Sequence, residues 1–502
     1  MSSPEPNKEC STRLPLELHN EIINILRDDL EALRACASTC RAFSSVAQKL
    51  IFSCIIVIAG TNRKGGDYLT DAQFLDILEN SPRIGSYVRS VKLARANAPE
   101  EMKTLIDKLY HGRDFKMGRT IFSCLTYLTE LECLSIDYGS GWKTRVLTAD
   151  DEKRLEQELA CTLQLPTLHS LDMGHMTPGL LQYRKNLKFL CVDGATLEEP
   201  KWVPNPGMPR CSVKSLLVKL DGSNHQTIQK FRSQLNILCS SVIDITQLKR
   251  LFMVCCRHTP TQYHYVLADL LQACGQNLEF LVLDPNKDGE TRELLLMHKS
   301  LTCLLTNFFF TNSVRDPYDA TATLSLSNLT ALKRLHIRVN TMYDDPISPH
   351  YLPWIINVLK TLPQGNSSRL VHLSFQINYD NYESQNDFLL CAELYHLAVD
   401  ANRFPRLQLL EMTGCSYLST AAGDKIYEDW QSNFGISNIS TPTIRIKLLS
   451  KRRFISPFAL GVVSADLLLI VDEADQELYP FWPNESFKQL ISRQNDVWRP
   501  YY

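Results

Sequence analysis

An apolar frame of the form L-x-x-L-x-L recurs along most of this chain and constrains its fold more than any other feature. Its fourth and sixth positions are two residues apart, the spacing of a β-strand with one buried face. Successive frames start 19 to 43 residues apart, so the repeat is irregular although the frame is not. With Val allowed for Leu, the frames open at Val88, Leu131, Leu168, Leu187, Val213, Leu248, Leu278, Leu301, Leu332, Leu370 and Leu407.

The ninth position of the frame shows a second regularity. Asn or Cys occupies it in several frames, as in LKRLFMVCC and LKRLHIRVN. In leucine-rich repeats the side chain at this position bonds to backbone groups of the turn after the strand. The chain therefore resembles the leucine-rich-repeat family over its long middle part, with ninth positions at Cys256, Asn286, Asn340, Asn378 and Cys415.

The segments between the frames carry apolar residues at helical spacing, for example Val266, Leu270 and Leu271. A single strand-helix unit cannot cover its own apolar face, so neighbouring units must stack. We therefore expect an α/β solenoid, a curved leucine-rich-repeat-like array with a parallel sheet on the inside and helices on the outside. The unequal spacing leaves the number of true repeats open.

The first fifty residues have apolar positions at helical rather than strand spacing. One helix with an apolar face is predicted by Leu14, Leu18, Ile22 and Leu26. Pro15 fits its first turn, and Asp28 or Asp29 can cap a second helix. The apolar face of that second helix consists of Leu33, Cys36, Ala37 and Cys40. A third helix is predicted with an apolar face of Phe43, Val46, Ala47, Leu50 and Ile51. So small a unit leaves apolar area facing water, and we expect it to need a partner.

The runs LPLELHNEIINIL and LRACASTCRAFSSVAQKLIF resemble the F-box as it occurs in fungal proteins, over residues 13 to about 58. The likeness lies in the LPxEL opening, a Cys-Arg-aromatic step and a closing LIF; Phe43 stands where the family often has Trp. The resemblance implies docking on a Skp-type adaptor and, through it, on a cullin-RING ubiquitin ligase. The adaptor-binding residues that it implies are Leu14, Pro15, Leu18, Ile22, Ile23, Leu26, Leu33, Cys40, Arg41, Phe43, Leu50 and Phe52. The alternative is an ordinary three-helix cap on the domain that follows.

Side-chain alternation also predicts which strand residues lie on the inner, concave face of the sheet. The third, fifth and seventh positions of each frame point away from the core. Exposed apolar surface commonly marks an interface, so we expect a substrate-docking face there. An apolar patch followed by a basic rim is formed by Phe189, Leu217, Phe252, Val254, Phe280, Val282 and Leu305, and by Arg334, His336, Arg338 and His372. Two alternatives stay open: the C-terminal tail or a long loop covers this face, or the register differs by one residue and these residues are core.

These patterns divide the chain into five regions. We expect a helix that ends near Pro82 to join the helical domain to the array, and a terminal cap, which solenoids need, after the last frame. The regions are a disordered tail at 1–12, the F-box-like domain at 13–58, the linker helix at 59–87, the irregular leucine-rich-repeat-like domain at 88–440 and the C-terminal cap at 441–502.

Composition argues against several functions. The 53 basic and 55 acidic side chains nearly cancel, so no global field favours nucleic acid or an anionic membrane. No stretch approaches the roughly 18 apolar residues of a membrane span, and the start lacks a secretory h-region, so we expect the cytoplasm and/or nucleus. The 16 cysteines form no CxxC pair. The densest group of potential metal ligands is Cys255, Cys256 and His258, of which Cys256 is explained by the repeat, so we expect no metal and no cofactor.

The sequence contains no phosphate-binding loop, HExxH, GxSxG or kinase motif. We therefore expect no catalytic residues and a substrate-recognition adaptor of an SCF-type ubiquitin ligase, which would hold a target protein near the conjugating enzyme. The alternative is a leucine-rich-repeat scaffold unconnected with ubiquitin. A third hypothesis is an enzyme whose site is assembled from scattered residues. The target protein is not named by the sequence.

Overall fold

The structure of the protein is a computed structural model. It describes residues 16–27, 29–39, 41–59, 69–95, 123–137, 157–173, 178–193, 208–221, 225–256, 263–284, 325–341, 351–379, 393–416 and 443–450. The tail predicted at 1–12 and most of the segment predicted as a cap lie outside these residues.

The strands of the described residues form one 14-stranded sheet in which every pairing is parallel. The order in the sheet follows the chain from β3 to β14, except that β8 pairs with the start of β7; β1 pairs with β3, and β2 lies beyond β1. The strands are β1 (Cys54–Ala59), β2 (Leu69–Thr70), β3 (Ser90–Arg95), β4 (Cys133–Asp137), β5 (Ser170–Met173), β6 (Asn186–Asp193), β7 (Cys211–Asp221), β8 (Ile243–Asp244), β9 (Arg250–Cys256), β10 (Phe280–Asp284), β11 (Arg334–Thr341), β12 (His372–Tyr379), β13 (Leu409–Ser416) and β14 (Thr443–Ser450).

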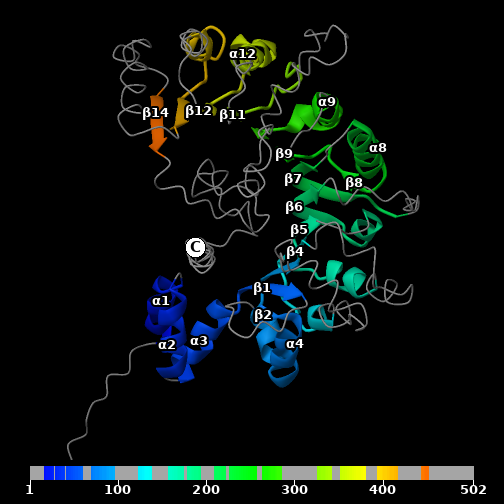
Figure 1. Cartoon of the computed structure of the whole chain (residues 1–502), viewed down its shortest axis with the longest axis vertical. Helices are drawn as coiled ribbons and strands as arrows, with labels where there is room; N and C mark the ends of the chain where they lie inside the picture. The colour runs from blue at the N-terminus through cyan, green and yellow to red at the C-terminus, as the bar shows by residue number, and fades with distance from the viewer. Residues whose placement is uncertain are drawn as a thin grey trace, which may run out of the picture.

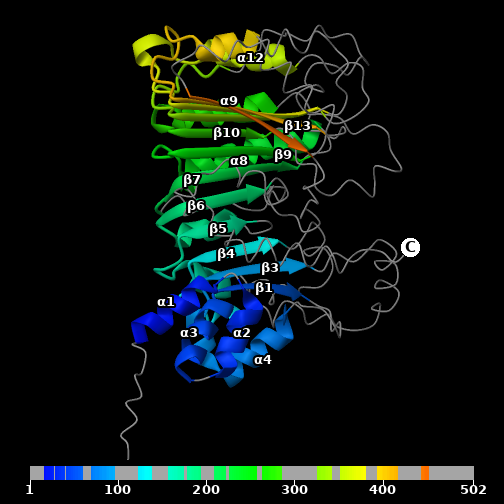
Figure 2. The same cartoon turned by 90° about the vertical axis from the view of Figure 1, so that its left-hand side faces the viewer.

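Helices lie on the outer side of an arc that the strands line on the inside (Figure 1), and the side view shows the strands stacked in chain order (Figure 2). The outer elements are α4 (Asp71–Asn80), α8 (His225–Ser241), α9 (Tyr263–Cys274) and α12 (Tyr351–Thr361), with short 3-10 turns η1 (Pro82–Tyr87), η2 (Pro178–Tyr183), η4 (Gly275–Asn277) and η5 (Gly365–Ser367). The described helices include none that is both long enough and apolar enough to cross a membrane. The expected parallel α/β arrangement with outer helices is therefore present.

One continuous hydrophobic cluster runs between the sheet and these helices, from Ile55 to Leu410. The first, fourth and sixth positions of the frames supply its sheet side, as Leu187, Leu190 and Val192 do in β6. Because each unit shares this layer with the next, the apolar face that one unit leaves open is covered by its neighbours.

The predicted frames coincide with strands, apart from the frame at Leu301, which lies outside the described residues. Four of the fourteen strands were missed: β1, β14 and the two-residue strands β2 and β8. β1 follows the same spacing with Phe52, Ile55 and Val57, but Phe opens it; β14 opens on polar residues and lies in the segment predicted as a cap. The boundaries at 58, 88 and 440 are therefore wrong as limits of the sheet, which extends from Cys54 to Ser450.

Ninth positions of successive frames are aligned across the sheet. Asn340 pairs in register with Asn378, and Asn378 with Cys415. Neighbouring frames thus keep the same phase although the segments between them differ in length. Asn286 lies outside the described residues.

The N-terminal unit has the three expected helices, α1 (Leu16–Ile25), α2 (Leu30–Thr39) and α3 (Arg41–Ile51). Asp29 caps α2, because its Oδ1 accepts a hydrogen bond from Ala32 N at 3.0 Å. The small core consists of Ile23, Leu33 and Ala47, against which Leu26, Cys36, Ala37, Phe43, Val46, Leu50 and Ile51 pack. Asp28 lies outside the described residues.

The helical unit is joined directly to the sheet. Phe52 packs against the main core, and Ser53 O accepts hydrogen bonds from Arg89 N and Ser90 N, both at 2.9 Å. The ammonium group of Lys49 lies 5.8 Å from the ring centroid of Tyr87. The helix predicted to end near Pro82 is present as α4, which begins at a capping box formed by Thr70 and leads through η1 to β3.

Candidate protein-interaction site

One face of α1 carries exposed apolar side chains. Leu18 is 42% exposed, Ile22 43% and Ile25 81%. Positions 18, 22 and 25 share one helix face because their spacings are four and three residues. Ile23 on the opposite side is fully buried in the helical unit's core. We call Leu18, Ile22 and Ile25 the α1 stripe.

The structure divides the residues implied by the F-box resemblance into two groups. Leu18 and Ile22 are open to a partner, whereas Ile23 and Leu33 are buried inside the helical unit, so their assignment to a direct adaptor contact is wrong. Partly buried side chains that pack on the protein's own cores are those of Leu26, Phe43, Leu50 and Phe52. Outside the described residues lie Leu14, Pro15 and Cys40, and of Arg41 only the backbone at the start of α3 is described.

Sequence reasoning missed Ile25 and placed Leu26 on the wrong face. Each step of four residues rotates about 40° around a helix, so a stripe read as 18, 22, 26 drifts toward the core side. A step of seven residues rotates by only about 20°, which keeps Ile25 beside Leu18. The seven-residue spacing was the signal that could have found Ile25.

The concave face follows the predicted alternation but is not exposed. Phe189, Leu217, Phe252, Phe280 and Val282 are absent from the main cluster, which contains their strand neighbours, and all five are buried. The prediction of an open apolar docking patch is therefore wrong at these residues, since burial depends on what covers a face and alternation gives only the face. Leu305 and the side chain of Val254 lie outside the described residues.

Two of these rings form a specific contact. Phe252 and Phe280 meet edge to face, with centroids 5.4 Å apart and an interplanar angle of 89°. They come from neighbouring strands, where Phe252 is paired in register with Val282.

We expect Phe252→Leu to destabilise the protein by about 1–2 kcal/mol, because it removes this ring pair and leaves a small void. Phe375→Leu is the matched control, since Phe375 is also fully buried but makes no ring contact among the described residues. Urea unfolding monitored by circular dichroism measures both. An equal or larger loss for Phe375→Leu would contradict a special role for the ring pair.

A charged pair lies on the concave face of the sheet near its N-terminal end. Asp172 Oδ2 accepts a hydrogen bond from Lys219 Nζ at 3.3 Å and another from Ser135 Oγ at 3.1 Å. Both charged side chains are largely buried. Burial alone would raise the pKa of Asp172, but the charge of Lys219 and hydrogen bonds from Cys191 and Ser135 outweigh it, so its pKa is lowered. This pair fixes the relative position of β5 and β7.

The predicted basic rim is largely closed as well. His336 is buried, and His372 Nε2 lies 3.0 Å from Glu411 Oε2 on the next strand. Arg334 is half-buried, and the side chain of Arg338 lies outside the described residues. The described part of this rim thus presents no open basic surface.

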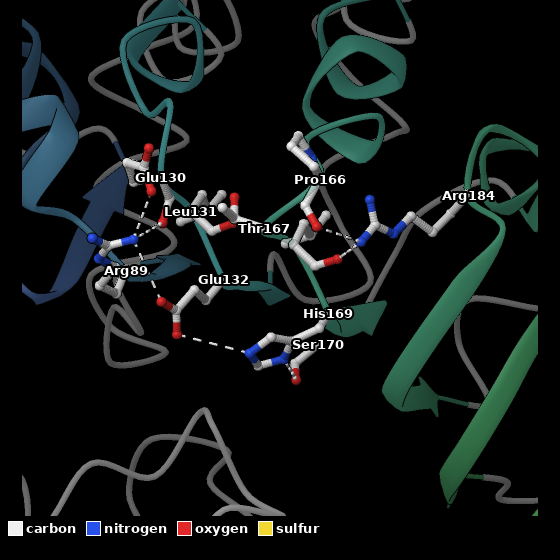
Figure 3. Close-up of polar contacts among 10 residues, drawn as sticks. Arg89, Glu130, Leu131, Glu132, Pro166, Thr167, His169, Ser170 and Arg184 are labelled. Atoms are coloured by element: carbon white, nitrogen blue, oxygen red, sulfur yellow. Dashed lines mark hydrogen bonds and ion pairs between the residues drawn. The ribbon is translucent and has the colours of Figure 1, made fainter.

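A row of mostly charged side chains follows the starts of the strands, one residue after each frame opens. At one end, Arg89 Nη1 lies 2.8 Å from Glu130 Oε2 and 3.5 Å from Glu132 Oε1, and His169 Nε2 lies 3.7 Å from Glu132 Oε2 (Figure 3). Near the other end, Glu279 pairs with Lys249 at 3.0 Å and with Lys333 at 2.8 Å. The row, which we call the strand-start row, comprises Arg89, Glu132, His169, Lys188, Lys214, Lys249, Glu279 and Lys333.

Two arginines close to this row in the sequence, Arg184 and Arg210, donate hydrogen bonds to backbone carbonyls of other segments. The guanidinium of Arg184 donates to the carbonyls of Leu165 and Leu168. It also donates to Pro166 O at 3.3 Å (Figure 3). Arg210 Nε donates to Ile243 O at 3.1 Å. Both guanidinium groups therefore bond to backbone carbonyls of the segments that lead into the neighbouring strands β5 and β8.

Four of the described thiols are strongly affected by burial. Burial raises the pKa of Cys124, Cys211, Cys239 and Cys274 to about 12, which keeps these thiols protonated near neutral pH. No group of three or more potential metal ligands occurs within the described ranges. Of the predicted weak cluster, the backbones of Cys255 and Cys256 are described, and His258 lies outside.

The α1 stripe and the strand-start row are therefore the two open surfaces on which a function can be argued. Comparisons with protein-family models, curated proteins and solved structures gave no match to this chain.

Proposed function

We propose that this chain is a non-catalytic adaptor that binds a Skp-type protein of an SCF-type cullin-RING ubiquitin ligase through its N-terminal helical unit. In this proposal the leucine-rich-repeat-like arc carries the target protein. The observation that carries it is the α1 stripe, an apolar face left open by a helical unit whose small core is formed by Ile23, Leu33 and Ala47.

The energetic argument concerns the area of these side chains. Full burial of a Leu or Ile side chain contributes about 1.5–3 kcal/mol, so half-exposed Leu18 and Ile22 and the more exposed Ile25 still hold a few kcal/mol for a partner. Three of the six exposed large hydrophobic residues among those described lie on this ten-residue helix. Such clustering marks interfaces more often than single exposed residues do.

The direct joint between the helical unit and the sheet also supports the proposal. The bonds of Ser53 and the contact of Lys49 with Tyr87 bring the unit against the first strands. An adaptor bound at α1 would then hold its position relative to a target on the arc, which raises the effective concentration of target lysines at the ligase.

The test is co-purification of the full-length chain with a recombinant Skp-type adaptor, measured by size-exclusion chromatography with both proteins at micromolar concentration. A stoichiometric complex supports the proposal. Absence of a complex favours the second candidate, a protein-interaction scaffold unconnected with ubiquitin, which the parallel sheet and the open stripe equally allow.

A further inference from the structure

The strand-start row has ion pairs at both ends. Glu130 and Glu132 pair with Arg89 at one end, and Glu279 pairs with both Lys249 and Lys333 toward the other. Between them lie Lys188 and Lys214, both exposed, for which the described residues provide no ion-pair partner.

The two lysines are cross-strand neighbours. The pairs Leu187 with Val213 and Phe189 with Ser215 flank them in the β6–β7 register, which places Lys188 opposite Lys214 on adjacent strands. Like charges directly opposite each other in a sheet are destabilising. Burial lowers the pKa of His169, which directly precedes β5, and the charge of Lys188 lowers it further.

Neighbouring residues extend this positive surface. Lys185 is exposed, and its carbonyl accepts a hydrogen bond from Ser212 N at 2.8 Å, which ties it to the start of β7. Arg184 and Arg210 add positive charge beside it while bonding to carbonyls. The cations of this surface thus lie in, or just before, the two adjacent strands β6 and β7.

We propose that Lys185, Lys188 and Lys214 form a binding surface for an acidic polypeptide segment. Adjacent strands lie about 4.8 Å apart, so the surface from His169, just before β5, to Lys214 on β7 spans about 10 Å, which matches about three residues of an extended peptide. Carboxylates on such a segment would supply the ion-pair partners that Lys188 and Lys214 lack among the described residues. This inference goes beyond the adaptor function and holds whether or not α1 binds a ligase component.

The charges at the two ends favour a short acidic peptide over nucleic acid. A nucleic-acid strand carries a phosphate at every nucleotide and needs an extended basic track. Here the lysines without an ion-pair partner among the described residues cover only a short stretch, because two carboxylates lie beside Arg89 at one end and Glu279 already pairs with Lys249 and Lys333 toward the other. A segment with a few carboxylates fits between them.

The test uses the full-length protein and a fluorescein-labelled hexaglutamate peptide, with fluorescence anisotropy as the readout. We expect the wild type to bind it in a salt-dependent manner and Lys188→Ala with Lys214→Ala to weaken binding about tenfold. Lys230→Ala with Lys360→Ala removes the same charge from outer helices α8 and α12, and we expect a change of no more than about twofold.

Three results would overturn the inference: no binding by the wild type, an equal loss in both double variants, or tighter binding of an oligothymidylate of the same length through the same lysines. A second double variant distinguishes loss of the binding surface from loss of folding. Lys188→Glu with Lys214→Glu should lose hexaglutamate and gain a labelled hexalysine peptide, which an unfolded protein would not do selectively. Binding of the Skp-type adaptor, measured on the same lysine variants, should be unchanged. The peptide-binding inference and the adaptor proposal can therefore fail independently.

Discussion

Leu18→Asp combined with Ile22→Asp should abolish capture of a Skp-type adaptor and leave the thermal unfolding of the protein almost unchanged. Both side chains are more than two-fifths exposed, so carboxylates there face water in the free protein. In a complex the same carboxylates would be buried against an apolar surface without partners, which costs several kcal/mol. We expect an affinity loss of at least about 100-fold, measured by isothermal titration calorimetry.

A matched control is Tyr183→Asp with Ile237→Asp. These residues have comparable exposure, 44% and 41%, but lie on η2 and α8 away from the helical unit. We expect this variant to bind the adaptor like the wild type. If both double variants retain binding, or both lose it, the α1 stripe is not the adaptor-binding surface.

Lys219→Met should destabilise the protein by about 3–5 kcal/mol near neutral pH, because it leaves the buried carboxylate of Asp172 without its cation. Methionine keeps most of the side-chain volume of Lys219, so the loss of stability reports the missing charge rather than a cavity. Urea unfolding gives the free energy of unfolding. Asp172→Asn with Lys219→Met removes both charges, and we expect it to be more stable than Lys219→Met alone.

The contribution of Asp172 to the free energy of unfolding should change with pH in opposite directions in the wild type and in Lys219→Met. In the wild type the pKa of Asp172 is lowered on folding, so its contribution to stability is present above the unfolded pKa and is lost as pH falls through the folded one. In Lys219→Met the cation is absent, so we expect burial to raise the pKa of Asp172. Protonation of Asp172 as pH falls then removes the buried charge and restores stability. The deficit of the variant should therefore shrink between about pH 7 and about pH 5. A deficit that is constant over this range would show that the pair is not electrostatically coupled.

The N-terminal helical unit shows which features residue spacing can predict and which it cannot. Three helices and the Asp29 cap could be predicted because apolar periodicity and capping are local properties. The outward face of α1 could be predicted only in part: Leu18 and Ile22 are open, but Ile25 was missed and Ile23 lies inside. Which of two apolar sides of a helix faces the core is decided by the helices that pack on it.

The concave face shows the same division. The frame placed Phe252 and Phe280 on the side opposite the main core, in agreement with the structure. Their burial could not be predicted, because alternation of side chains specifies a face and not its cover. The pairing of Asp172 with Lys219 was also invisible, since 47 residues separate them in the chain.

The sequence by itself determined the parallel α/β architecture, because a short apolar frame that recurs in one phase can be buried only by stacking strand on strand and helix on helix. It also determined where most strands lie. Tertiary structure alone decided which surfaces stay open, the α1 stripe and the unbalanced lysines of the strand-start row, and which are closed. The reason is that exposure and charge balance depend on neighbours brought together from distant parts of the chain.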